Sequence, residues 1–163
     1  MFERFSPAAR ILAVCAIDIA AADGAATVEA EHLLLALTRQ AEDPTTHGLT
    51  LETEDATTRA LNTLGITETA VRAALDSEFA DALQAVGVTA TRSPSRRGRS
   101  RPKWGQSAKL ALERTLQVTV DRGHKRIDTR HLLLALSHAE AGVVPRVLRT
   151  LDVSASDIDA ALR

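Results

Sequence analysis

The chain of 163 residues is poor in cysteine and in aromatic side chains. Its single cysteine is Cys15, and its only aromatic residues are Phe2, Phe5, Phe79 and Trp104. One cysteine excludes a disulfide framework and a cysteine-based metal cluster. Few aromatics disfavour a β-sandwich, whereas an interior of Ala, Leu, Val and Ile predicts closely packed helices. Cys15 is expected to be a small core residue, because a reactive thiol would need a basic or cationic neighbour.

The sequence also lacks a strong net charge and a long apolar run. The formal net charge is −1, so the chain as a whole is not built to bind polyanions. The first apolar stretch, Ile11 to Ala26, contains Asp18 and Asp23. It is therefore too short and too polar for a transmembrane helix or a signal peptide. These features predict a cytoplasmic protein that makes no contact with a membrane.

Motifs for catalysis are missing as well. No G-x-x-x-x-G-K-[ST] loop occurs, so ATP hydrolysis is excluded and no cofactor is expected. No G-x-S-x-G turn accompanies the serines. The histidines have neither a partner at i+4 nor a cysteine pair with metal-ligand spacing. His32 and His131 are expected to play the same structural role, donating to a loop carbonyl or packing beside leucines. Binding, rather than catalysis, is the activity that the sequence predicts.

An internal repeat organises the chain. The string His32 to Leu37 recurs letter for letter as His131 to Leu136, 99 residues further on. At that offset Phe5 to Leu37 aligns with Trp104 to Leu136, with 8 of 33 pairs identical. A later block, Thr58 to Leu75, aligns with Pro145 to Leu162 at an offset of 87, with 7 of 18 pairs identical. The two blocks occur in the same order, which indicates duplication rather than chance.

Each copy has the pattern of four helices. Ser6 and Thr67 are suitable N-caps in the first copy, as are Asp128 and Ser154 in the second. Gly24 stands where the first helix is expected to end. The predicted fold class is all-α, with two four-helix repeats related by a pseudo-twofold axis. The expected organisation is a first repeat over 1–91 with an acidic surface insert over 40–55, a linker over 92–103 and a second repeat over 104–163.

The linker from Arg92 to Lys103 contains six cations and no acid. Such a segment would give weak, salt-sensitive affinity for nucleic acid. No aromatic residues are interleaved with the cations, and no recognition helix is apparent. A flexible, solubilising linker is therefore favoured over nucleic-acid binding.

The opening Phe2 to Phe5 and the paired strings Glu31 to Leu37 and His131 to Leu136 resemble the Clp N-terminal (Clp R) domain. This double-repeat domain precedes the ATPase modules of AAA+ unfoldases, and the Lys109 to Glu113 segment is similar to the ClpC group. The resemblance covers nearly the whole chain. Because the ATPase modules are absent, the chain is expected to stand alone or to be a domain of a longer protein. The partners implied are Clp unfoldase or protease components and tagged substrates.

The resemblance further implies a groove between the repeats that takes up peptide-like ligands, including cyclic peptide antibiotics such as cyclomarin. The corresponding positions here are Phe2, Arg10, Trp104, Lys109 and Glu113. Two rings offer apolar area, the cations can donate to carbonyls, and the carboxylate can accept from amides. Trp104 replaces the Phe common in the family. The alternative is that Phe2 and Trp104 only close the ends of the two repeats.

A second function implied by the resemblance is the capture of phosphorylated arginine. In the family, the acid before each leucine-rich string helps to hold the guanidinium of that ligand. The first copy retains Glu31, whereas the second has Arg130. Because an arginine cannot pair with a guanidinium, at most one site of the usual form is expected. The alternative role of Glu31 is an acid in the first helical turn, favoured by the helix dipole.

Overall fold

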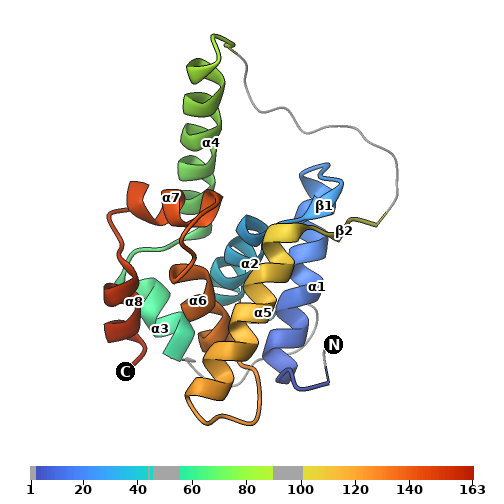
Figure 1. Cartoon of the computed structure of the whole chain (residues 1–163), viewed down its shortest axis with the longest axis vertical. Helices are drawn as coiled ribbons and strands as arrows, with labels where there is room; N and C mark the ends of the chain where they lie inside the picture. Colours follow the sequence, from blue (N-terminus) through green and yellow to red (C-terminus); the bar gives the residue numbers. More distant parts are fainter. Residues whose placement is uncertain (1–2, 44, 46–55, 90–100) are drawn as a thin grey trace.

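The computed structural model of the chain describes residues 3–43, 45, 56–89 and 101–163. In this part of the chain, helices dominate (Figure 1). The elements are α1 (Pro7–Ala22), β1 (Thr27–Val28), α2 (Ala30–Glu42), α3 (Ala56–Thr63), α4 (Glu68–Ala85), β2 (Lys103–Trp104), α5 (Gln106–Asp121), α6 (Thr129–Ser137), α7 (Val143–Thr150) and α8 (Ala155–Ala161). The predicted all-α class is confirmed.

The helices begin where the capping residues predict. The Ser6 hydroxyl accepts from the Ala9 amide at 3.2 Å at the start of α1. Thr67 caps α4 in the same way. Each such bond satisfies one of the amides that a helix leaves unpaired at its N-terminus. Gly24 follows the end of α1 with φ +68°, a left-handed conformation that suits glycine.

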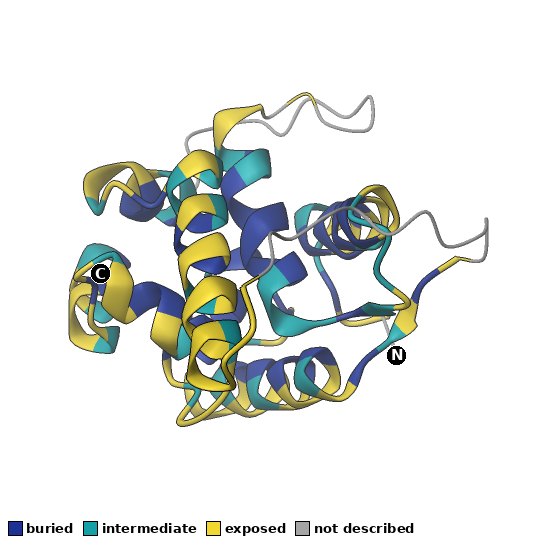
Figure 2. Ribbon diagram, turned by 90° about the horizontal axis from the view of Figure 1, so that it is seen from above, coloured by how far each residue is buried: buried dark blue, intermediate teal, exposed yellow. Residues whose placement is uncertain are grey.

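The two leucine-rich helices form the centre of the molecule. All residues of the His32–Leu37 string of α2 and the His131–Leu136 string of α6 are buried. The helices of both repeats contribute to one continuous apolar cluster, which includes Cys15. Burial raises the pKa of the Cys15 thiol, although the nearby Arg39 acts in the opposite direction. Figure 2 shows the buried positions on the inward faces of the helices. Cys15 is thus confirmed as a core residue.

Backbone pairing between the repeats follows the pseudo-twofold relation. β1 and β2 pair in parallel, with Val28 opposite Trp104. An isolated bridge joins Phe5 to Ile127. Under the offset of 99 residues, Phe5 corresponds to Trp104 and Val28 to Ile127, so each contact is the counterpart of the other. The Ser6 amide donates to the Ile127 carbonyl at 2.8 Å, and the equivalent Gly105 amide donates to Val28 at 2.9 Å.

Helix packing repeats the same relation, with one departure. α1 packs on α2 as α5 packs on α6, and α2 contacts α7 as α6 contacts α3. The counterparts α4 and α8 differ in length, because α4 has 18 residues and α8 has 7. Figure 1 shows the additional turns of α4 rising past α7.

The boundaries of the first repeat differ slightly from expectation. The surface insert was expected from Gln40, but α2 continues to Glu42. The reason is tertiary: Gln40 donates to the Ala8 carbonyl of α1 at 3.3 Å, and the Glu42 carboxylate accepts from the Glu68 amide at 2.7 Å. Residues 46–55 of the insert and 92–100 of the basic linker lie outside the described residues, as does Phe2. Among the described helices, none combines the length and apolarity needed to cross a bilayer.

Candidate functional site

The paired histidines complete the N-terminal caps of α2 and α6. The Glu29 amide donates to Nδ1 of His32 at 2.9 Å, and the Asp128 amide donates to Nδ1 of His131 at 2.9 Å. Each ring therefore completes a capping box at the start of α2 or α6. The predicted shared structural role is confirmed, except that Nδ1 of each ring accepts a backbone hydrogen bond. This capping role could not be predicted from the usual pattern, in which Ser or Thr caps the helix and Glu or Gln occupies N3.

A second histidine lies beside His131. His131 Nε2 and His124 Nδ1 are 2.7 Å apart. Because His131 Nδ1 accepts from a backbone amide, the proton of the neutral ring is on Nε2, and Nε2 donates to His124. Burial, together with the charges of Arg130 and His124, lowers the pKa of His131 to about 4. This interior ring is thus neutral near pH 7.

The N-cap residues also contact the opposite repeat. The carboxylate of Glu29 accepts from the amide of Ser107 at 3.1 Å and from its hydroxyl. In the symmetric location, the Ser6 hydroxyl donates to Asp128 at 3.1 Å. Burial acts to raise the pKa of Glu29, but hydrogen bonds from Ser107 and Thr27 outweigh it and hold the pKa below its usual value. These crossed caps fix the start of α5 against α2.

Gly105 is expected to be required at this junction. A Cβ at position 105 would overlap the Glu29 carboxylate, so Gly105→Ala should displace that carboxylate from Ser107. The loss is expected to lower the free energy of unfolding by about 1–2 kcal/mol. Ser107→Ala should cost a similar amount, and the double variant should cost less than the sum, because both changes remove the same bonds. Urea denaturation measures all three; strictly additive losses would contradict the shared contact.

A groove opens beside this junction. It has a volume of about 510 Å³ and is lined by α1 and by the segment entering α5. Its lining residues are Arg10, Ala13, Val14, Ile17, Arg101, Pro102 and Trp104. The floor is apolar. Val14 is 42% exposed there, which is unusual for an apolar side chain. An apolar concave surface with a few polar groups at its edge is typical of a ligand site.

The charged groups of the groove have one sign. Arg10 and Arg101 both line it, and no acid occurs among its described lining residues. One amino group of the Arg10 guanidinium lies 3.4 Å from the Glu3 carbonyl, a long hydrogen bond on an exposed side chain. The Arg10 guanidinium is therefore held only weakly by the protein. A guanidinium can donate hydrogen bonds to the carboxylates and carbonyls of a peptide.

The structure brings together some of the predicted ligand-binding residues. Arg10 and Trp104 come from different repeats and line the same groove. Lys109 and Glu113 are exposed on α5, at the positions equivalent to Arg10 and Val14 of α1, and are not among the described lining residues. Sequence reasoning missed Arg101 and Val14. Arg101 was assigned to a linker, and an exposed apolar residue cannot be distinguished from a core residue by helical spacing alone.

Glu31 and Arg130 occupy equivalent first-turn positions. Both are half-buried. The Nε atom of Arg130 is buried and has no hydrogen-bond partner among the described residues. Opposite charges occur at two pairs of equivalent positions near here, since Asp23 and Glu31 correspond to Arg122 and Arg130. The two repeats therefore present different electrostatic surfaces on the same backbone.

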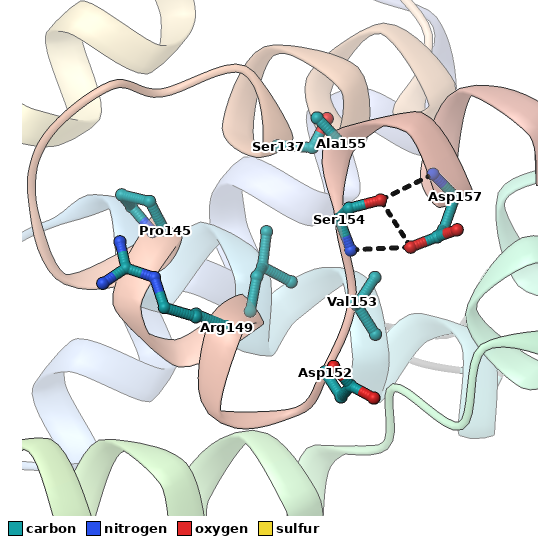
Figure 3. A pocket seen from close by; sticks show the side chains of 9 residues that line it. Ser137, Pro145, Arg149, Asp152, Val153, Ser154, Ala155 and Asp157 are labelled. Carbon is teal, nitrogen blue, oxygen red and sulfur yellow. Dashed lines mark hydrogen bonds between the residues drawn. The ribbon is translucent and has the colours of Figure 1, made fainter.

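A second hollow, of about 360 Å³, lies between α7 and the start of α8 (Figure 3). The polar side chains at its α8 edge, Ser154 and Asp157, bond to each other. The Asp157 carboxylate accepts from the Ser154 amide at 2.8 Å and from the Ser154 hydroxyl. These bonds form the predicted capping box and lower the pKa of Asp157. This hollow is better explained by helix capping than by ligand binding.

Comparison with known proteins agrees with the duplicated fold. Residues 103–163 match the family described as Clp repeat (R) N-terminal domain. The N-terminal domain of the chaperone ClpD from Arabidopsis thaliana is similar over 99% of this chain and 96% of its own, with 20% identity and a TM-score of 0.65. The Hsp104 N-terminal domain from Candida albicans is similar over 98% of this chain and 89% of its own, with 12% identity and a TM-score of 0.63. A structure from a malarial protein secretion system is similar over 98% of this chain and 92% of its own, with 15% identity and a TM-score of 0.62.

The two four-helix repeats, joined by crossed strands and caps, define an all-α double-repeat domain. Within that class, residues 103–163 match the Clp N-terminal repeat family, and the described chain has the fold of the N-terminal domains of ClpD and Hsp104.

Proposed function

We propose that the chain is a non-catalytic binding module of the Clp protease system that takes peptide-like ligands in the groove between its repeats. The observation that carries the proposal is the groove itself, where Arg10 and Trp104 from different repeats border an apolar floor. In a cell, such a module would present substrates as an adaptor or sequester cyclic peptide antibiotics of the cyclomarin type. Either role requires affinity without chemistry.

The positive charges of the groove indicate which kind of peptide it would bind. Arg10 and Arg101 favour a peptide whose apolar residues lie beside a carboxylate, because each cation would then be paired on binding. Trp104 supplies flat apolar area with few rotatable bonds, as binding hot spots do. Lys109 and Glu113 are proposed to contact only ligands long enough to reach α5.

Trp104→Ala is expected to weaken a cyclomarin-type cyclic peptide by more than tenfold in calorimetric titration. Removing a central ring from a binding site typically costs about 2 kcal/mol or more. Val14→Asp should weaken binding similarly without disturbing the core, since Val14 is exposed. Leu116→Ala, at the position of α5 equivalent to Ile17, is the matched control and should bind as the wild type does. Full affinity in both groove variants would place the ligand elsewhere.

Capture of phosphoarginine at Glu31 is the second candidate. It is favoured by the charge difference between the repeats, because only the first retains an acid at this position. A phosphoarginine peptide in the same titration separates the two candidates. Sensitivity to Glu31→Gln but not to Trp104→Ala would support the second.

A further inference from the structure

The C-terminal half of α4 is a surface that the groove does not use. All buried residues of α4, namely Val71, Ala74 and Leu75, lie in its first half. That half is also anchored by ion pairs, since Glu68 pairs with Arg39 of α2 at 2.6 Å and Arg72 pairs with Asp23 at 3.3 Å. The last turns of α4 extend past α7 and the rest of the described chain (Figure 1). The equivalent helix α8 has 7 residues, against 18 for α4.

The C-terminal end of α4 is closed by a regular helix C-cap. Gly87 has φ +74°, the left-handed conformation of a helix C-cap. Its amide donates to Gln84 at 3.0 Å, and the Val88 amide donates to the Leu83 carbonyl at 2.9 Å. This pair of bonds is a Schellman motif, which satisfies carbonyls that a helix end leaves unpaired. The extension is therefore a defined helix up to its last turn.

One side of this extension is apolar. Phe79, Leu83 and Val86 are spaced by four and three residues and share one helical face. Val86 is 72% exposed and the following Val88 is 47% exposed, while Phe79 is 37% exposed. A contiguous apolar surface on an exposed helix is typical of an interaction site.

The borders of the apolar face are acidic. At 100° per residue, Asp76 and Glu78 fall on its opposite sides. Asp81 lies on the far side of the helix and adds only to its overall negative charge, and residues 73–89 contain no Lys or Arg. Glu78 already accepts from the Arg146 guanidinium of α7 at 2.6 Å, which shows that this border can hold a guanidinium.

We infer that this face of α4 docks an amphipathic helix of another protein, with an apolar stripe bordered by Lys and Arg. The apolar stripes would pack as in a helix pair, and the basic borders would neutralise the acidic ones. A second copy of this chain fits poorly, because acids would then face acids. The eleven residues from Asp76 to Val86 span about 16 Å, or three turns of a partner helix.

The probe is a synthetic amphipathic helical peptide with leucine on one face and lysine on the other, compared with its glutamate counterpart. Titration by fluorescence anisotropy should show wild-type binding at least tenfold tighter for the lysine peptide. Leu83→Ser with Val86→Ser should weaken that binding at least tenfold. Asp76→Asn should weaken it and reduce its salt dependence.

The matched control is Leu116→Ser with Val120→Ser, two exposed apolar residues one turn apart on α5, which should leave the affinity unchanged. Val86→Ser alone should also weaken binding. Because this site is largely exposed, the single substitution should not unfold the protein. Equal affinity for the two peptides, or no effect of either α4 variant, would overturn the inference. So would sedimentation equilibrium showing a wild-type dimer that Val86→Ser dissociates, because the occupant would then be a second copy.

Discussion

Leu133→Ala is expected to lower the free energy of unfolding by about 3–4 kcal/mol. Leu133 is fully buried in the central helix α6, and large-to-small changes at such sites cost about 2–5 kcal/mol through lost burial and the cavity that remains. Leu34→Ala, at the equivalent position of α2, should cost a similar amount. For a domain of ordinary stability, either loss is a large part of the total.

The same variants test whether the two repeats unfold together. Trp104 is the only tryptophan and reports on the start of the second repeat, whereas circular dichroism reports on the helices of both. Because the apolar cluster is continuous through α2 and α6, Leu34→Ala in the first repeat should shift both signals to the same urea midpoint. Separate midpoints would show two independent units. Leu116→Ala, at a 40% exposed site, should change stability by only about 0.5 kcal/mol.

Acidification from pH 7 to pH 5 is expected to destabilise the protein by about 2 kcal/mol through His131. Its pKa is about 4 in the fold, against 6.5 for an ordinary histidine. Between these values the unfolded chain binds a proton that the folded chain does not, so stability falls as the pH falls. The full contribution of the neutral ring is present above about pH 6.5. Burial is the main cause, and Arg130 and His124 add to it.

The pH range from 7 to 5 distinguishes the titration of His131 from that of the carboxylates. Glu29 and Glu68 have pKa values lowered from 4.5, so their contributions are lost only below about pH 4.5. His131→Gln is the control, because a glutamine at this position can still accept from the Asp128 amide but does not titrate. Its urea midpoint should change little between pH 7 and pH 5. An equally steep pH dependence in this variant would assign the effect to another group.

The local features of the fold could be predicted from sequence because they depend on neighbouring residues. Ser6, Thr67 and Ser154 cap the helices predicted for them. Gly65 and its counterpart Asp152 both adopt positive φ, although only the glycine indicated a helix end, since aspartate tolerates this conformation less well. Repeat identity correctly predicted a shared structural role for the two buried histidines.

The groove could be predicted only in part. Resemblance and ring placement indicated Arg10 and Trp104, which line it, but the partner cation is Arg101 rather than Lys109. Arg101 precedes β2, and its position beside α1 depends on the pairing of Val28 with Trp104 across the repeats. That pairing joins residues far apart in the chain, and no local spacing encodes it.

The sequence by itself determined the helices, their caps, the duplication and the leucine-rich centre, because periodicity and capping act over a few residues. Only the tertiary structure decided which side chains meet across the pseudo-twofold axis. It placed Glu29 against Ser107, His124 against His131 and Arg10 near Trp104. It also left the outer half of α4 outside the shared core, because burial depends on where the other repeat packs and not on the composition of the helix.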